Sequence, residues 1–439
     1  MPSFRLFFLV ALLVALALAA PAPNPKRVVQ KRSFVVPRQL NPSHPGPNGL
    51  AAMKKVFSKY KFEMRDDFQV GEGLISNTKQ DANANANSNQ NGSSGQQPAT
   101  TPIDQTGTVV ATPEQNAALF LSPVTIGGQN FSLDFDSGSA DLWCFSVEQS
   151  QAQIQQHAAF DPAKSPTFKF LKGFQFSISY GDGSGASGIV GTDDVTIGGV
   201  KVVGQTVELA TNVSDSFVKD NNTDGLVGLA FSKLNTVNDG TKKTPAKTFF
   251  DNVMNDLDLP VFTADLDPDG TGVYEFGKID STKFVGPLTW VPVKAETGFW
   301  QFPSTKFAIG NQVFSHPRGS DAIADTGTSL LLVDQPVANT YYSQVQGARL
   351  SAQAGGFIYP CQTTLPDFSV GVGDHFATIP GNLLTFAAVD KAKTMCFGGI
   401  QGNQGAGMQI FGDVMFRAQF VVFNGGNQSL GFGQKPPIQ

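Results

Sequence analysis

The chain has 439 residues, more than one domain usually holds, so we expect two lobes with additional segments. Its low content of charged residues (15%) and its 46 glycines indicate many turns between short strands, which favours an all-β fold. Basic residues prevail over 1–100 and acidic residues over 101–439, which argues against nucleic acid as a partner. The basic front can dock onto the acidic body, although a solvated tail explains the same charges.

The first 19 residues have the layout of a secretory signal peptide. Arg5 supplies the positive charge, an apolar run follows over 6–16, and Ala17-Leu18-Ala19 is a small-residue cleavage site. A membrane anchor would need a longer apolar run, and no later segment is long and apolar enough. We therefore expect a secreted, extracellular protein with no membrane attachment after signal removal.

Residues 20–100 are interpreted as a propeptide that ends in a flexible linker. The part before about residue 76 is basic and contains one helix-like patch. The stretch 81–95 consists mostly of Asn, Ala, Ser and Gly, so it cannot bury enough apolar surface to offset the entropy of ordering. A signal, a basic segment, a linker and a globular body in this order are typical of a zymogen.

From about residue 105 the pattern changes to short alternating runs separated by turn residues. The run 131–135 alternates apolar and polar residues like a half-buried strand, and 195–203 is typical of a hairpin built on a Gly-Gly pair. Helical patterns are few, the clearest being 248–257 and 337–345. The body is therefore predicted to be mostly β.

Five Asn-x-Ser/Thr sequons are glycosylation candidates in a secreted protein. They lie at Asn91, Asn130, Asn212, Asn221 and Asn427. The motif is short, so chance matches among these five are expected.

The chain has three cysteines. Cys361 and Cys396 lie in the same region and can close a modest loop, worth roughly 3–4 kcal/mol. Cys144 is left over, and we expect a buried free thiol because no histidine lies near it in sequence. No His-x-x-x-His or Cys-x-x-Cys spacing occurs, so no metal site is expected.

A carboxylate motif of the form apolar–Asp–Ser/Thr–Gly–Ser/Thr occurs twice. The two copies are Phe135-Asp136-Ser137-Gly138-Ser139 and Ala324-Asp325-Thr326-Gly327-Thr328. Each is followed, at nearly the same spacing, by two apolar residues and a glycine, at 226–228 and 410–412. This repetition indicates an internal duplication with one copy per lobe, and we expect the lobes to span 101–283 and 284–439.

Asp136 and Asp325 are the candidate catalytic pair. Two carboxylates brought close together cannot both ionise readily, so they share one proton. One can then act as base on a water molecule while its protonated partner donates to the carbonyl of the bond that is cut. A single copy of the motif would be explained as an ordinary Asx turn, but the duplication argues against that reading.

The other residues of the two motifs are candidates for supporting the pair. The glycines allow backbone to approach the carboxylates closely. The hydroxyl directly after each Asp can link the two loops, and the second hydroxyl can hold the outer carboxylate oxygen. These supporting residues are Ser137, Gly138, Ser139, Thr326, Gly327 and Thr328.

These motifs resemble the pepsin family of aspartic proteases, and most of all its fungal secreted penicillopepsin and aspergillopepsin members. The matching blocks are 135–143, 179–184, 224–230 and 323–330, and the resemblance extends from about residue 105 to the end. It implies a bilobal all-β fold whose cleft holds a polypeptide substrate in extended form. It also implies acidic, pepstatin-sensitive endopeptidase activity without metal or cofactor, in a monomer.

The resemblance also implies substrate-binding residues. Tyr180 and Gly181 match the flap that closes over substrate, and Trp143 matches the partner of the Tyr180 hydroxyl. Leu226 matches the lining of the pocket for the residue before the scissile bond, where large apolar residues are preferred. Cys361 and Cys396 match the second-lobe disulfide of the family.

Asp182 follows Tyr180 and Gly181 in the flap motif. In similar fungal enzymes an acidic residue here goes with acceptance of Lys before the scissile bond. A turn-forming Asp explains the motif equally well.

Lys59-Tyr60 resembles the Lys-Tyr pair with which zymogens of this family block the active site. A lysine between the two carboxylates would neutralise them and displace the catalytic water, so the propeptide would be an intramolecular inhibitor. Lys54, Lys55 and Lys61 leave the choice of lysine open, and a solvated basic face is the alternative. We expect acid self-activation with cleavage near 90–105.

Two other classes of function compete with this interpretation. A catalytically dead relative could bind or inhibit another protein on the same scaffold, but it should carry damage in the Asp, Gly or flap positions, and none is damaged. A glycosidase also uses paired carboxylates, but it leaves the duplicated loops and the flap unexplained.

Overall fold

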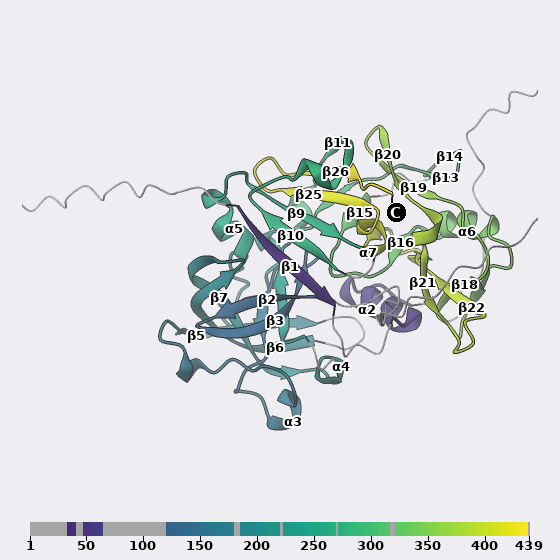
Figure 1. Cartoon of the computed structure of the whole chain (residues 1–439). Helices are drawn as coiled ribbons and strands as arrows, with labels where there is room; N and C mark the ends of the chain where they lie inside the picture. Colours follow the sequence, from purple (N-terminus) through teal and green to yellow (C-terminus); the bar gives the residue numbers. More distant parts are fainter. Residues whose placement is uncertain are drawn as a thin grey trace, which may run out of the picture.

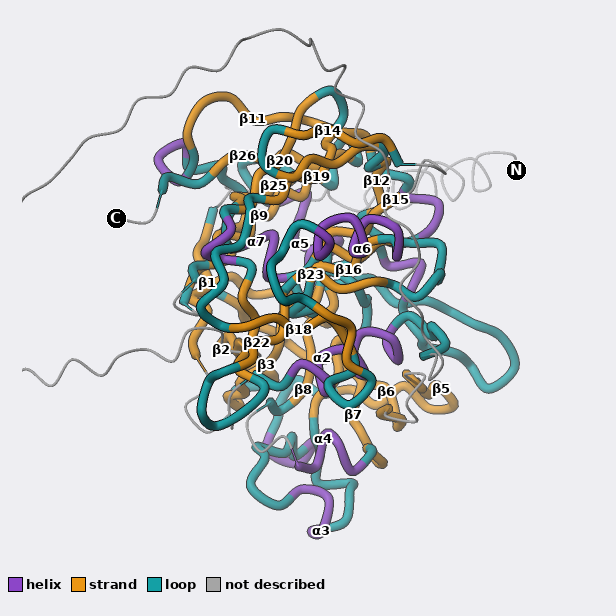
Figure 2. Tube along the Cα trace, turned by 90° about the vertical axis from the view of Figure 1, so that its right-hand side faces the viewer, coloured by secondary structure: helices purple, strands orange, loops and turns teal. Residues whose placement is uncertain are grey.

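The protein is described by a computed structural model that covers residues 33–40, 47–64, 120–179, 185–219, 223–268, 271–316 and 321–437. The expected signal peptide (1–19) and the Asn-rich stretch (81–95) lie outside these ranges. Strands dominate the described chain, and the helices are few and short (Figure 2). No helix within the described ranges has the length and apolar character needed to cross a membrane.

The largest sheet joins thirteen described strands that come from both halves of the chain (Figure 1). In spatial order they are β11 (Val285–Pro292), β26 (Ser429–Gln434), β25 (Gln419–Asn424), β9 (Val261–Leu266), β10 (Gly272–Phe276), β1 (Phe34–Leu40), β2 (Phe120–Ile126), β3 (Gln129–Asp136), β8 (Gly225–Gly228), β4 (Leu142–Cys144), β7 (Val200–Val213), β6 (Gly185–Ile197) and β5 (Lys169–Ser179). Because this sheet crosses the expected lobe boundary at 283/284, the position of that boundary stays a prediction.

Three smaller sheets complete the C-terminal lobe. They are β12 (Gln301–Pro303), β15 (Asp321–Ala324), β24 (Gln409–Phe411), β16 (Leu331–Val333) and β23 (Ile400–Gly402); β14 (Gln312–Ser315), β13 (Lys306–Ile309), β19 (Phe368–Val372) and β20 (His375–Ile379); and β17 (Arg349–Ser351), β18 (Gly356–Pro360), β22 (Met395–Gly398) and β21 (Thr385–Ala388). The α-helices are α2 (Gly49–Lys59), α3 (Gln151–Ile154), α4 (Asp215–Lys219), α5 (Phe249–Val253), α6 (Gln335–Ser343) and α7 (Asp413–Phe416). This bilobal, mostly β architecture is the predicted fold class.

The internal duplication is visible in how the strands pair. β3 runs parallel to β8, with Asp136 opposite Gly228, and β15 runs parallel to β24, with Ala324 opposite Phe411. On the other side of each partner strand lies an antiparallel neighbour, β4 for β8 and β16 for β24. The repeated apolar-apolar-Gly triplets are therefore the strands against which the two Asp-bearing strands pair.

Several local predictions agree with the structure. The run 131–135 lies in β3, and β6 and β7 form a hairpin whose two turn glycines have positive φ (57° and 81°). The helix expected at 248–257 forms as α5 followed by a 3₁₀ turn over 254–256, and the helix expected at 337–345 begins two residues earlier, as α6.

Strand β1, from the expected propeptide, lies inside the largest sheet. It pairs antiparallel with β10 along most of its length and with β2 at its end, so it crosses the middle of the molecule (Figure 1). Phe34 and Val36 are buried in the main core while Val35 is exposed, the period of two expected of a strand with one covered face. This strand of the basic segment is thus built into the fold rather than attached as a tail.

Helix α2 follows from local sequence signals. The Asn48 side chain accepts a hydrogen bond from the Ala51 N–H (2.9 Å) and caps its start. Met53, Val56 and Phe57, at helical spacing, are buried against the C-terminal lobe. The helix ends at Lys59.

Candidate active site

The two motif aspartates lie at the ends of equivalent strands and face each other. Asp136 is the last residue of β3, and Asp325 directly follows β15. Both carboxyl groups are buried, with Asp136 2% and Asp325 0% exposed. The glycine of each loop makes the approach possible: a Cβ on Gly138 would lie 2.6 Å from an Asp325 oxygen, and one on Gly327 2.5 Å from an Asp136 oxygen.

Reciprocal hydrogen bonds join the two Asp loops. The Ser137 N–H donates to Thr326 Oγ1 (3.1 Å), and the Thr326 N–H donates to Ser137 Oγ (2.9 Å). The Ser137 hydroxyl then donates to the carbonyl of Ala324 (2.9 Å) and the Thr326 hydroxyl to that of Phe135 (2.8 Å). All of these groups are buried, so each hydroxyl is fully engaged between the lobes.

The two carboxyl groups are held in the same way. Asp136 accepts hydrogen bonds from the Gly138 N–H (2.8 Å) and the Ser139 hydroxyl (2.7 Å). Asp325 accepts hydrogen bonds from the N–H two residues later (3.0 Å) and from the Thr328 hydroxyl. The structure thus brings together every residue of both predicted motifs.

Lys59 lies between the two carboxylates. Its Nζ is 2.6 Å from Asp136 Oδ1 and 2.8 and 2.9 Å from the two oxygens of Asp325. The Tyr60 hydroxyl donates to Asp325 Oδ2 (2.8 Å), and its ring packs near those of Phe62 and Phe299. Of the four neighbouring lysines that the sequence left open, Lys59 is the one that contacts both carboxyl groups.

Burial and charge act against each other at this site. Burial alone would lower the pKa of Lys59, but Asp136 and Asp325 outweigh it and raise that pKa well above its usual value. Burial raises the pKa of Asp136. Burial would also raise the pKa of Asp325, but the Lys59 ammonium and the hydrogen bond from Thr328 hold it at about 2.

The remaining predicted substrate residues are partly described. Trp143 and Leu226 are buried and lie opposite each other on β4 and β8. The Trp143 Nε1 has no hydrogen-bond partner among the residues that the structure describes. The predicted flap residues Tyr180, Gly181 and Asp182 lie outside the residues that the structure describes.

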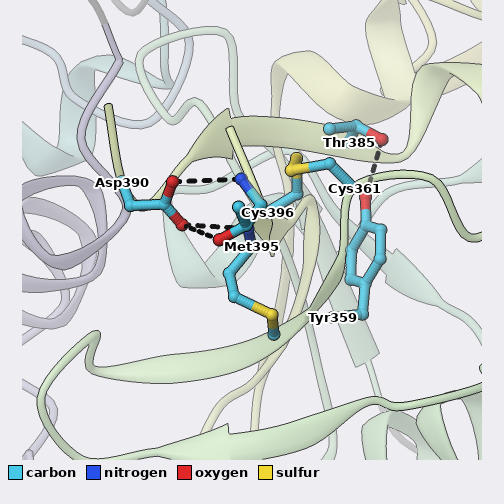
Figure 3. Close-up of a disulfide and its surroundings, with 7 residues drawn as sticks. Tyr359, Cys361, Thr385, Asp390, Met395 and Cys396 are labelled. Carbon is cyan, nitrogen blue, oxygen red and sulfur yellow. Dashed lines mark hydrogen bonds between the residues drawn. A yellow bond between two sulfur atoms is a disulfide. The ribbon is translucent and has the colours of Figure 1, made fainter. Parts of the chain in front are cut away.

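Cys361, directly after β18, and Cys396, in β22, form a disulfide with a Cα–Cα distance of 4.9 Å (Figure 3). Next to it the Tyr359 and Thr385 hydroxyls are hydrogen-bonded (2.6 Å). Cys144 is a buried free thiol, and burial raises its pKa far above the usual range. Such a group packs as a small apolar residue rather than reacting.

Three of the five sequon asparagines are described and all three are exposed: Asn130, Asn212 and Asn427. Asn91 and Asn221 lie outside the described residues. Glycosylation at these positions stays a prediction.

Two ion pairs of the segment expected to be a propeptide were not predicted from the sequence. Arg38 on β1 forms a buried pair with Asp413 at the start of α7 (3.1 Å). Lys55, one turn before Lys59 on α2, lies 4.0 Å from Asp134. Burial raises the pKa of Asp134 to about 6, although Lys55 acts to lower that pKa. A basic residue four positions before Lys59 was the available signal for the second pair, whereas nothing local marks the first.

A buried carboxyl pair behind the first Asp loop was also missed. The Glu208 and Asp141 side chains are hydrogen-bonded to each other, and the residues are 1% and 2% exposed. The Asn235 amide donates to Glu208 (2.7 Å) and to the carbonyl of Ala140 (3.2 Å), and Thr236 donates to Asp141 through its N–H (2.7 Å) and its hydroxyl (2.9 Å). This network braces the chain directly after the Asp136 loop.

Comparison with known proteins identifies the family. A family model described as eukaryotic aspartyl protease matches residues 119–435. The chain is 45% identical over 436 residues to an aspergillopepsin A-like aspartic endopeptidase of Aspergillus fumigatus, covering 97% of each chain. It is 42% identical over 391 residues to endothiapepsin of Cryphonectria parasitica (88% of this chain, 87% of the relative). It is 47% identical over 326 residues to penicillopepsin-1 of Penicillium rubens (74% of this chain, 80% of the relative).

This chain belongs to the pepsin-like family of eukaryotic aspartyl proteases. Within that family it is an aspartic endopeptidase of the fungal aspergillopepsin-like type, and its substrates are polypeptides.

The Glu208–Asp141 pair predicts a loss of stability as pH rises. Burial and then the Asp141 carboxyl group raise the pKa of Glu208 well above its usual value of 4.5. A raised folded-state pKa stabilises the protein fully below the unfolded value, and that stabilisation is lost as pH rises toward the folded value. Glu208→Gln keeps a donor to Asp141 without a titrating proton. The urea midpoint of unfolding should therefore fall less in this variant than in the unsubstituted protein between about pH 4.5 and about pH 8.

The matched control is Glu148→Gln, which removes an exposed carboxylate on the same lobe. It should unfold with the pH dependence of the unsubstituted protein. Parallel pH profiles for all three proteins would contradict the shared-proton interpretation.

Proposed function

We propose that this chain is made as a secreted zymogen and, after maturation, hydrolyses peptide bonds at acidic pH with Asp136 and Asp325 as its catalytic pair. The observation that carries the proposal is the facing arrangement of the two carboxyl groups, each held by equivalent hydrogen bonds on duplicated loops. Membership of the aspartyl protease family supports it. Maturation would leave a soluble monomer outside the cell.

The proposed reaction needs one protonated and one ionised carboxyl group. Sharing a proton across a close carboxyl pair is a general property of aspartic proteases. The ionised group takes a proton from water, the new oxygen–carbon bond forms, and the protonated group donates to the carbonyl oxygen. The carbon–nitrogen bond then breaks, and a proton passes to the leaving amine. Hydrogen bonds from Ser139 and Thr328 to the outer oxygens would keep both groups oriented toward the substrate.

The first test replaces each aspartate separately. Asp136→Asn and Asp325→Asn should each lower kcat at least ~10³-fold, because neither variant can share a proton across the pair. Denatured haemoglobin digested across acidic pH, with and without pepstatin, measures the effect. To avoid dependence on self-processing, each precursor is matured through a foreign protease site inserted in 81–95. Substantial pepstatin-sensitive activity in either variant would contradict the assignment.

The contacts of Lys59 support an inhibitory role for the propeptide. An ammonium group within 3 Å of both carboxylates leaves no room for a catalytic water and removes the free base. The Tyr60 hydroxyl occupies an acceptor site on Asp325 as well. Met53, Val56 and Phe57 of the same helix are buried against the C-terminal lobe, and this packing would hold the lysine there.

Acid should weaken this inhibition. The Lys59 contacts hold the pKa of Asp325 at about 2, below its usual 3.8, so their stabilisation is complete above 3.8 and lost as pH falls toward 2. Burial raises the pKa of Asp134 to about 6, so this carboxyl group takes up a proton earlier, and its attraction for Lys55 fades in mild acid.

A precursor with Lys59→Gln should therefore cleave itself faster than the native precursor, and should do so at a less acidic pH. Mass spectrometry after acidification measures the cut, which we expect near 90–105. Lys61→Gln, an exposed lysine two residues away, is the control and should behave like the native chain. A native precursor that never shortens in acid, at any protein concentration, would refute self-activation.

The proposed specificity is for large apolar residues before the scissile bond, with Lys also accepted. Trp143 and Leu226 lie side by side on β4 and β8, where the proposed flap would close on them. The unpartnered Trp143 Nε1 supports the proposal that the Tyr180 hydroxyl accepts its hydrogen bond.

Asp182→Thr tests whether the flap carboxylate recognises Lys. We expect kcat/KM for a peptide with Lys before the scissile bond to fall about tenfold, while the Phe-containing counterpart is cut as before, because only the Lys loses a charge partner. Equal cleavage of the Lys peptide by both enzymes would favour a purely turn-forming Asp182.

A further inference from the structure

His157 is a buried histidine whose two ring nitrogens both face backbone carbonyl oxygens. It follows α3 in the chain and is 6% exposed. Its Nδ1 lies 3.0 Å from the carbonyl oxygen of Thr223, and its Nε2 lies 3.3 Å from that of Val218. A carbonyl oxygen only accepts hydrogen bonds, and a neutral imidazole carries one N–H, whereas the protonated ring carries two. Only the protonated ring can therefore donate to both carbonyls.

Two further neighbours favour a positive charge on this ring. The ring of Phe145 stacks on it, with centroids 3.8 Å apart and planes 9° apart, and an aromatic face attracts a cation. The Asp224 carboxylate accepts hydrogen bonds from the N–H groups of Ser132 (2.9 Å) and Ala158 (2.8 Å). Burial raises the pKa of Asp224, while these N–H groups and the charge of His157 lower it. An ionised Asp224 and a protonated His157 thus stabilise each other.

The other titratable groups on the neighbouring elements act less directly on the imidazole. Glu148, in the turn after β4, and Asp215 and Lys219, on α4, are exposed, and water screens their charges. The buried thiol of Cys144 stays neutral because burial raises its pKa far above the usual range. Asp224 is therefore the main charged neighbour of the ring among the residues that the structure describes.

The two carbonyls belong to two different elements of the fold. Val218 lies in α4, and Thr223 lies two residues before β8. Residues 220–222, between them, lie outside the described residues. α3 and α4 are neighbours at one end of the molecule (Figures 1 and 2), so a side chain that follows α3 can reach α4. His157 thereby ties the end of α4 to the start of β8.

α4 is part of the apolar cluster around the proposed substrate pocket. Phe217 packs edge-on against the ring of Trp143, with centroids 5.1 Å apart. Val218 is buried in the same cluster as Trp143 and Leu226, and Leu226 lies on β8. A shift of α4 relative to β8 would therefore change the shape of the surface around Leu226.

We propose that protonated His157 is a positioning residue that holds α4 against β8 and so keeps the apolar pocket at Trp143 and Leu226 in its binding shape in acid. When the ring loses its proton, one of the two carbonyls loses its donor, and α4 is held less firmly. The inference rests on the proposed function, which assigns this pocket to the substrate residue before the scissile bond. The preference for large apolar residues would then be strongest at acidic pH.

The first measurement follows substrate preference in the matured enzyme. Two peptides that differ only in Phe or Ala before the scissile bond are digested at pH 4 to 7, and the ratio of their kcat/KM values is taken at each pH. Titration of the catalytic pair affects both peptides alike, so it cancels in the ratio. The native ratio should fall about fivefold as pH rises, mainly through KM of the Phe peptide, because one buried hydrogen bond is lost.

His157→Gln places one amide donor group at this position at every pH. Because it resembles the neutral ring, it should show the low ratio already at pH 4 and change little as pH rises. His375→Gln makes the same substitution at an exposed histidine on β20 and is the matched control. It should keep the native ratio and the native pH dependence.

Hydrogen exchange in the precursor tests the positioning role without catalysis. At pH 5.5 the N–H groups of α4 should exchange about fivefold faster in His157→Gln than in the native precursor. Those of β3 and β8 should stay as protected as in the native precursor, which also shows that the variant folds.

The outcomes separate this inference from the proposed function. Equal Phe-to-Ala ratios for the native enzyme and His157→Gln at pH 4, or a native ratio that stays constant to pH 7, would overturn the inference. Equal exchange in α4, or faster exchange throughout β3 and β8, would overturn it as well. Failure of the matured native enzyme to cut either peptide at acidic pH would instead contradict the proposed function, and hydrogen exchange would still decide the role of His157.

Discussion

The hydrogen bonds that cross between Ser137 and Thr326 are the constraint on which the site depends. The N–H of each residue donates to the hydroxyl of the other, and each hydroxyl donates a hydrogen bond to a carbonyl of the opposite loop. Both residues are buried, so each group left unpaired would cost about 1–3 kcal/mol. The exchange fixes the two loops, and therefore Asp136 and Asp325, relative to each other, although the loops belong to strands 189 residues apart. A Ser in one loop and a Thr in the other serve equally, because only the hydroxyl is used.

Two buried carboxyl pairs in this protein solve the same electrostatic problem differently. Asp136 and Asp325 are compensated by an ammonium group, and that compensation would be removable if Lys59 leaves with the proposed propeptide. Glu208 and Asp141 sit behind the first loop and rely on a proton held between them, with the Asn235 amide on one oxygen. Burying a charge without either device would cost several kcal/mol. The removable ammonium group lies at the carboxyl pair where catalysis is proposed, and the proton held between Glu208 and Asp141 lies where the first Asp loop needs rigid support.

The parts of the structure that could be predicted are those with a repeated or local signal. The doubled Asp-Ser/Thr-Gly motif fixed the site because the glycines, hydroxyls and carboxylates all contact one another across the duplication. Lys59 was the candidate because Tyr60 follows it, but the sequence did not exclude Lys55, and in the structure both lie on one face of α2 and each reaches an aspartate of β3. The Arg38–Asp413 pair joins residues 375 positions apart, and neither residue type nor spacing marks it. Insertion of β1 between β10 and β2 was missed for the same reason: the pairing partners of a strand are set by the whole sheet.

The contacts of α2 divide into two kinds that respond differently to acid. Those of Lys55 and Lys59 depend on ionised carboxylates, so protonation weakens them. Those of Met53, Val56 and Phe57 are apolar and do not change with pH in this range. Acid alone would therefore loosen the end of the helix at the carboxylate pair while its apolar side still holds to the lobe. Under the zymogen proposal the site would be freed before the proposed propeptide departs, and a cut in the proposed linker would then complete its release by removing the covalent tether.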